Sequence, residues 1–219
     1  MARVTSTFRR GVRLGVPFAV VGFVLSLSFG VLATQAGFSR LQAMVTSTIV
    51  FAGSAQFAAL AIVAAGGGIG AAVAAGAMMN SRYLAMGIAL APSLPGGVLR
   101  RVLTGQVVVD SSWVLANRGD GTFDRGLLLG TSAPQYVAWV AGTVVGVYAG
   151  DVIGEPGRFG LDAVFPTFFL GLLITELADR RRRVAALLGG GIALALVPFT
   201  PAGVPVLVAA AAAIIGLRA

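Results

Sequence analysis

The chain has no cysteine, no histidine and no lysine, and only 11% of its 219 residues are charged. Without cysteine there is neither a disulfide framework nor a thiolate metal site, and without histidine the commonest metal ligand and neutral-pH acid–base group is missing. An ordinary soluble domain carries about 25% charged residues, so a water-facing fold is excluded. We therefore expect that the protein is not an enzyme and that it binds neither a metal nor a cofactor.

Long apolar runs take up most of the chain, in which 57% of residues are hydrophobic. A bilayer core about 30 Å thick asks for ~20 apolar residues per helix. The sequence thus predicts an all-α polytopic membrane protein with seven to eight transmembrane helices, forming one transport domain over residues 1–219. The predicted spans are 15–35, 43–65, 70–91, 102–117, 127–150, 162–178, 184–199 and 203–217.

The positions of the arginines predict the orientation. All 16 basic residues are arginines, and they lie almost entirely between the apolar runs, which indicates membrane topology and not a nucleic-acid surface. Because cytoplasmic loops hold an excess of basic residues, we expect a cytoplasmic N-terminus. The pair Arg100 and Arg101 conflicts with this, since eight simple spans put it outside. A re-entrant segment within 43–65 or 102–117 would remove the conflict, and both arrangements stay open.

A weak sequence similarity between two parts of the chain, here called the echo, indicates an internal repeat. The stretch from Ser54 to Ala59 is similar to the stretch from Ser132 to Ala138, which has one inserted proline. If the second and fifth segments correspond, three spans separate them, and segments 1–3 and 4–6 form an inverted repeat with broken helices near Gln56 and Gln135. Chance recurrence of small residues in a chain rich in alanine and glycine explains the echo equally well.

Polar residues inside the predicted spans are the candidate functional residues, because a charge near the bilayer centre costs ~3 kcal/mol. Gln56 follows Ser54 at a plausible helix break, where it either binds substrate or forms an interhelical hydrogen bond. In the next span, Asn80, Arg82 and Tyr83 follow one another. The Arg82 guanidinium has two donors for the oxygens of a carboxylate, although it could also extend to the membrane interface.

Three further polar residues lie in the fourth and fifth predicted spans. Asp110 either pairs with Arg82 to fix helix packing or carries a coupled proton, since burial raises a carboxylate's pKa. Gln135 and Tyr136 follow Pro134, which frees the carbonyl one turn earlier for a substrate, water or hydroxyl.

Five short motifs stand out in the chain: Gly15-Val16-Pro17, Ser28-Phe29-Gly30, the stretch from Phe51 to Leu60, Asn80-Ser81-Arg82-Tyr83 and Ala89-Leu90-Ala91-Pro92. Together they resemble the AzlC-like branched-chain amino-acid permease family over about residues 8–183. The fourth predicted span departs from the family, which often has Thr-Asp-Glu there, because only Asp110 of that triplet is retained. The resemblance implies export of branched-chain amino acids through a bacterial inner membrane together with a small AzlD-like membrane subunit.

These observations predict a secondary transporter whose zwitterionic substrate lies near the bilayer midplane. We expect the substrate carboxylate near Arg82 and Asn80, and its ammonium near Asp110 or free carbonyls around Gln56 and Gln135. The expected partners are membrane lipid, the small subunit and the amino acid. An ion or small-solute channel and a structural subunit without transport of its own are the alternatives. The full candidate set is Ser54, Gln56, Asn80, Arg82, Tyr83, Gln135 and Tyr136 for substrate, with Asp110 for coupling or an ion pair.

Overall fold

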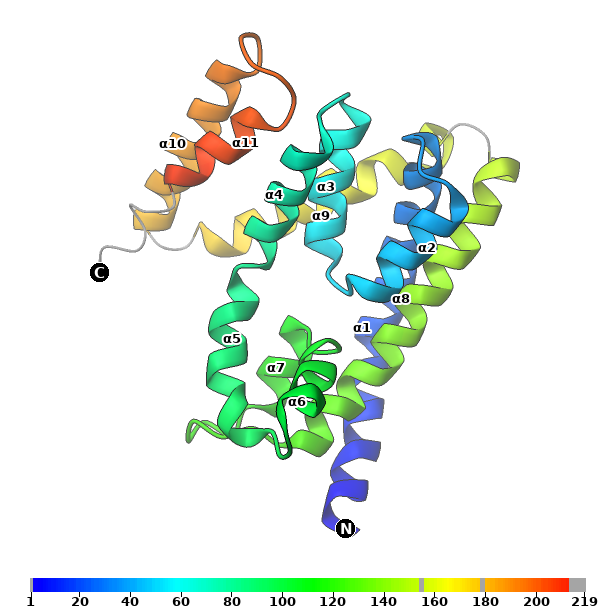
Figure 1. The fold of residues 1–219 in the computed structure, drawn as a ribbon, viewed down its shortest axis with the longest axis vertical. Helices are drawn as coiled ribbons and strands as arrows, with labels where there is room; N and C mark the ends of the chain where they lie inside the picture. The colour runs from blue at the N-terminus through cyan, green and yellow to red at the C-terminus, as the bar shows by residue number, and fades with distance from the viewer. Residues whose placement is uncertain (1, 154–155, 178–179, 213–219) are drawn as a thin grey trace.

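The structure, a computed structural model, describes residues 2–153, 156–177 and 180–212, and within these the fold is all-helical, as the apolar runs predicted (Figure 1). Short 3-10 turns follow α5, precede α9 and follow α11, at Ala91–Ser93, Pro156–Phe159 and Ala210–Ala212. The helices are α1 (Ala2–Gln35), α2 (Arg40–Ile49), α3 (Gly53–Ala64), α4 (Ile69–Asn80), α5 (Arg82–Leu90), α6 (Val98–Gly105), α7 (Asp110–Ala116), α8 (Arg125–Ile153), α9 (Leu161–Glu176), α10 (Arg180–Leu196) and α11 (Val204–Ala209).

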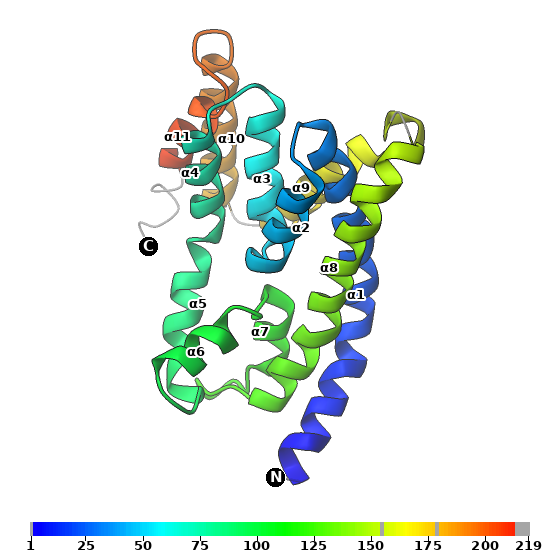
Figure 2. The same ribbon diagram turned by 45° about the vertical axis from the view of Figure 1, so that its right-hand side comes forward.

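The two longest helices, α1 and α8, lie side by side along the molecule (Figures 1 and 2). A Cβ atom added to Gly15 would lie 2.5 Å from the Thr131 carbonyl oxygen, and one added to Gly30 would lie 2.6 Å from that of Thr143. Residue numbers rise together along the contact, so the helices are parallel. Glycine is needed here because backbone meets backbone.

The predicted span 43–65 is two helices that form a hairpin, α2 and α3. Arg40, at the start of α2, contacts Tyr148, and Thr48, near its end, contacts Tyr136. Because residue numbers rise along α2 while those of the partners on α8 decrease, α2 runs antiparallel to α8. Helix α3 then returns parallel to α1, with Phe57 packed on Phe29 at 5.7 Å between ring centroids. Both ends of this hairpin therefore lie at the end of the molecule opposite the N-terminus (Figure 2).

Helices α4 and α5 run almost in line down the other side of the molecule, interrupted only at Ser81 (Figures 1 and 2). The predicted span 102–117 is a second hairpin, α6 and α7, which enters from the N-terminal end. Helix α7 runs antiparallel to α8, since Ser111 hydrogen-bonds Gln135 while Ala116 packs in one cluster with Leu128.

Two expectations about the repeat are wrong. The segments of Gln56 and Gln135 do not have opposite directions, because α3 and α8 both run parallel to α1. No break occurs at Gln135 in the described chain, since α8 is continuous through Pro134. The break expected near Gln56 lies at residues 50–52, before α3 begins. What is inverted is the pair of hairpins, which enter from opposite ends.

The remaining spans are supported unevenly. Within the described residues, one helix, Ser6–Gln35, is long and apolar enough to cross a membrane by itself, and Gly53–Ala64 and Ile69–Asn80 are apolar but shorter. The predicted count of seven to eight spans thus stays a prediction. Near the C-terminus, α10 and α11 pack as a tight helical pair, and the predicted residues 213–217 lie outside the described chain.

Candidate functional site

The tips of the two hairpins meet near the middle of the molecule. The first tip, residues 50–52, ends in extended backbone at Ala52, with φ −151° and ψ 90°. The second tip, residues 106–109, contains three consecutive valines, whose branched Cβ disfavours helix, and Val109 is extended. The Gln106 side-chain amide donates a hydrogen bond to the Ile49 carbonyl, which α2 leaves free at its end. The tips are thus joined directly.

Arg82, at the start of α5, contacts both hairpins. Its guanidinium nitrogen Nη2 lies 2.9 Å from Asp110 Oδ2, at the start of α7, and donates to Ser54 Oγ at 3.1 Å, near the start of α3. The Tyr83 ring lies 5.2 Å from the guanidinium carbon. The side chains of Arg82 and Asp110 are 40% and 53% exposed, so both charges remain accessible to a ligand or to water.

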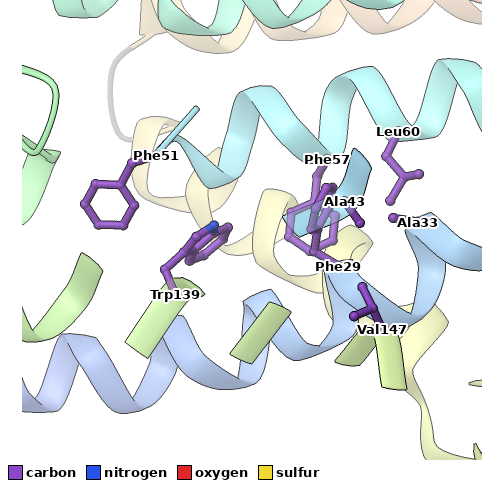
Figure 3. Close-up of a cluster of buried hydrophobic side chains, with 8 residues drawn as sticks. All are labelled: Phe29, Ala33, Ala43, Phe51, Phe57, Leu60, Trp139 and Val147. Carbon is purple, nitrogen blue, oxygen red and sulfur yellow. The ribbon is translucent and has the colours of Figure 1, made fainter. Parts of the chain in front are cut away.

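Gln56 belongs to a separate, buried hydrogen-bond circuit. Trp139 Nε1 donates to Gln56 Oε1 at 2.9 Å, and Gln56 Nε2 donates to Ser47 Oγ at 3.2 Å. The hydroxyls of Ser47 and Thr143 are 2.7 Å apart, and Thr143 donates to the Trp139 carbonyl at 3.1 Å. Figure 3 shows Trp139 beside α3 among the residues of the main apolar cluster. Both ends of the Gln56 amide are therefore used in joining α2, α3 and α8.

Sequence reasoning missed Ser47, Trp139 and Thr143 as members of this circuit. A signal was present on α8, because Gln135, Trp139 and Thr143 are spaced four apart and so share one helix face. Their partner Ser47 could not be found in that way, since it is 96 residues from Thr143.

Gln135 and Tyr136 connect α8 to different hairpins. The Gln135 amide oxygen accepts from Ser111 Oγ at 2.9 Å, and its nitrogen donates to the Thr131 carbonyl at 2.8 Å. The Tyr136 hydroxyl donates to the Thr48 carbonyl at 3.0 Å, and its ring packs edge-on against Phe51. Helix α8 therefore holds the second hairpin through Gln135 and the first through Tyr136.

Two cavities approach the first tip from opposite ends of the molecule. One, of about 630 Å³, extends along α5 from Asn80 to Leu90 and borders the second tip. The other, of about 740 Å³, extends along α4 from Asn80 to Ile69. Val50 and Asn80 line both cavities. The two cavities therefore adjoin at Val50, in the first tip, and at Asn80.

The candidate residues differ in how they relate to these cavities. Asn80 and Tyr83 line the cavity along α5, and Gln56 and Asn80 line the one along α4. The Asn80 amide oxygen is buried and has no hydrogen-bond partner among the described residues. An unpaired buried acceptor is costly, so this atom is suited to receive a donor from a ligand. Arg82 lies two residues after Asn80 in the chain, but neither Arg82 nor its partner Asp110 lines either cavity in the described structure.

The comparisons with known proteins identify the family to which the chain belongs. An all-helical chain with a long apolar helix and broken helices around polar groups is of the class of integral membrane proteins. The family model described as "AzlC protein" matches residues 17–153, more than half of the chain, so the chain belongs to the AzlC family. No solved structure matches.

This chain aligns with three curated relatives over most of the length of each. "Inner membrane protein YgaZ" of Escherichia coli (strain K12) is 26% identical over 212 residues, covering 89% of this chain and 84% of that one. An "Uncharacterized membrane protein" of Archaeoglobus fulgidus is 30% identical, with 87% and 85% covered. "Branched-chain amino acid transport protein AzlC" of Bacillus subtilis (strain 168) is 23% identical, with 89% and 77% covered.

Proposed function

We propose that this chain is a secondary transporter that exports branched-chain amino acids across the bacterial inner membrane as a single domain, residues 1–219. The observation that carries the proposal is the pair of cavities that approach the first hairpin tip from opposite ends and share Val50 and Asn80. A transporter needs a substrate site that either side can reach in turn. The name of the Bacillus relative supports the choice of substrate.

The orientation proposed has the N-terminus in the cytoplasm and both hairpins re-entrant. In that arrangement the loop of residues 91–97 and the start of α6 lie on the cytoplasmic side. Arg100 and Arg101 then join the other cytoplasmic arginines, as the positive-inside rule favours, and the conflict in the sequence pattern disappears. Helix dipoles and free backbone groups at membrane depth are tolerated because protein and cavities surround the tips.

We propose that Asn80 accepts a hydrogen bond from the substrate ammonium through its unpaired amide oxygen. Val50, Met86 and Leu90 give the cavity along α5 an apolar lining suited to an aliphatic side chain. The substrate carboxylate takes the place of Asp110 on Arg82. Asp110, displaced from Arg82, is then the group proposed to couple substrate binding to proton transfer.

The test is efflux of labelled valine from cells that express the protein with and without a small AzlD-like membrane subunit, which we propose as its partner. We expect saturable efflux with the subunit, inhibited by leucine, and at least about tenfold weaker efflux from Asn80→Leu. Non-saturable flux of unrelated solutes would identify a channel. The absence of any flux with the partner present would identify a structural subunit.

A further inference from the structure

A third cavity, of about 810 Å³, lies at the N-terminal end of the molecule, away from the hairpin tips. Its lining comes from the start of α1, the turn after α5, helix α6, the loop between α7 and α8, and the start of α8. The polar residues in this lining are Thr7, Ser93, Arg101, Arg118, Asp124 and Arg125. Three guanidinium groups therefore face one carboxylate.

The single carboxylate is already fully engaged. Asp124 Oδ2 lies 2.9 Å from Arg118 Nη2, and its other oxygen accepts from the Leu127 N–H at 3.0 Å, which caps α8. Burial alone raises the pKa of the Asp124 carboxyl, but the hydrogen bonds from Leu127, Arg118 and Thr7 outweigh it and lower the pKa below the ordinary value. Asp124 is therefore ionised at neutral pH and neutralises Arg118.

Two positive charges in the cavity remain uncompensated. Arg125 Nε is buried and has no hydrogen-bond partner in the described chain. Arg101, on α6, makes no ion pair with any carboxylate that the structure describes. A buried guanidinium N–H without an acceptor is costly, so the cavity calls for an anionic ligand with several oxygens.

The surroundings of Arg101 indicate where such an anion comes from. Apolar side chains of α6 on either side of it are strongly exposed: Val98 by 80%, Leu99 by 73% and Val102 by 59%. An arginine among exposed apolar residues at the end of a membrane protein is suited to a lipid, with acyl chains on the apolar residues and the headgroup phosphate on the arginine. Free phosphate would contact only the arginines and would leave the exposed apolar residues of α6 without a ligand.

We propose that Arg101 and Arg125 bind the phosphate group of an anionic phospholipid in this cavity. The site is independent of the substrate path, since the cavity contains neither Val50 nor Asn80. Binding joins α6 to the start of α8, and so it stabilises the base of the second hairpin.

The test is the unfolding temperature of the purified full-length protein in a neutral detergent, with added phosphatidylglycerol, phosphatidylcholine or inorganic phosphate. We expect phosphatidylglycerol to raise it by several degrees and phosphatidylcholine to leave it unchanged. The rise should be lost in Arg125→Gln and in Arg101→Gln. It should persist in the matched control Arg100→Gln, which removes an equal charge one residue away from the cavity lining.

Arg101→Gln keeps the test decisive if Arg125→Gln does not fold, because the Arg101 side chain is exposed. Protection by phosphatidylglycerol that persists in Arg101→Gln, or equal protection by both lipids, would overturn the site. Protection by inorganic phosphate but not by phosphatidylglycerol would overturn the lipid as its ligand. The experiment measures unfolding temperature and not transport, so its outcome does not depend on whether the proposed function is correct.

Discussion

Arg82 is the residue on which the two hairpins converge, through Asp110 and Ser54. Replacing Arg82 with lysine keeps the charge but loses the planar guanidinium, whose paired N–H donors fit the two oxygens of a substrate carboxylate. Loss of one hydrogen bond to a charged group is worth roughly 1.5–3 kcal/mol. We expect valine efflux to fall by about tenfold or more while the amount of inserted protein stays unchanged.

A double-mutant cycle separates transport from packing at this pair. If the ion pair only fixes the helices, Arg82→Met or Asp110→Leu alone lowers the yield of folded protein, and the double variant restores it by removing the uncompensated charge. If the pair binds substrate, the double variant folds but does not transport. A well-folded double variant with the unmutated efflux rate would refute the substrate role.

Trp139 tests the buried circuit around Gln56. Trp139→Phe keeps an aromatic ring but leaves Gln56 Oε1 without its donor. An unsatisfied buried acceptor costs about 1–3 kcal/mol, so we expect a clear drop in the free energy of unfolding, measured by denaturant titration in detergent. Trp113→Phe is the matched control, because the Trp113 bond to the Met86 carbonyl is longer, at 3.4 Å. Equal losses in both variants would argue against the circuit.

At the scale of elements, composition alone could not distinguish a spanning helix from a hairpin. The runs 43–65 and 102–117 are mostly apolar although each contains polar residues, and hydropathy does not record a reversal of direction. The one indication was the misplaced pair Arg100 and Arg101. The echo of Gln56 and Gln135 was misleading, because both residues lie on helices that run the same way and face different partners.

The parallel contact of α1 and α8 predicts a sharp difference between glycines. In Gly30→Ala the new Cβ would meet the Thr143 carbonyl oxygen at 2.6 Å, so the helices separate and the free energy of unfolding falls by about 1–3 kcal/mol. Gly70→Ala, on α4, is the control, since nothing lies within 4 Å of its Cβ. There alanine should be neutral or slightly stabilising. Thermal unfolding of both variants in detergent checks this, and similar behaviour would contradict the close contact.

At the scale of the whole molecule, the polar candidate residues could be predicted, but their grouping could not. A polar group in a membrane is costly wherever it lies, so Arg82, Asp110 and Gln56 stand out in the sequence. Whether such a group lines a cavity or joins helices depends on residues far along the chain. Trp139 lies 83 positions from Gln56, and it is this contact that assigns the Gln56 amide to helix packing.

Single cysteines test the proposed re-entrant topology in a chain that has no cysteine of its own. With two hairpins, Gly68→Cys faces outside and Gly97→Cys faces the cytoplasm, whereas simple spans predict the reverse for both. Neither glycine has an atom within 4 Å of its Cβ, so the substitutions fit. We expect an impermeant thiol reagent added to intact cells to label Gly68→Cys but not Gly97→Cys.

Two reference positions complete the labelling experiment. Ser39→Cys is outside and Asp120→Cys is cytoplasmic in either arrangement, so they report reagent access and cell integrity. Labelling of Gly97→Cys but not Gly68→Cys would show that the segments 43–65 and 102–117 cross the membrane as simple spans. Labelling of Asp120→Cys but not Ser39→Cys would reverse the orientation.

The glycine contact between α1 and α8 also bears on how the chain is made. The start of α8 is 90 positions beyond the end of α1. At ribosomal rates of 5–20 residues per second, α1 therefore waits in the bilayer for about 5–18 s before its partner emerges. During that interval the glycine face of α1, which includes Gly15 and Gly30, has no partner on α8. A chain stalled at this stage presents an uncovered face of glycines that insertion chaperones and membrane proteases can recognise.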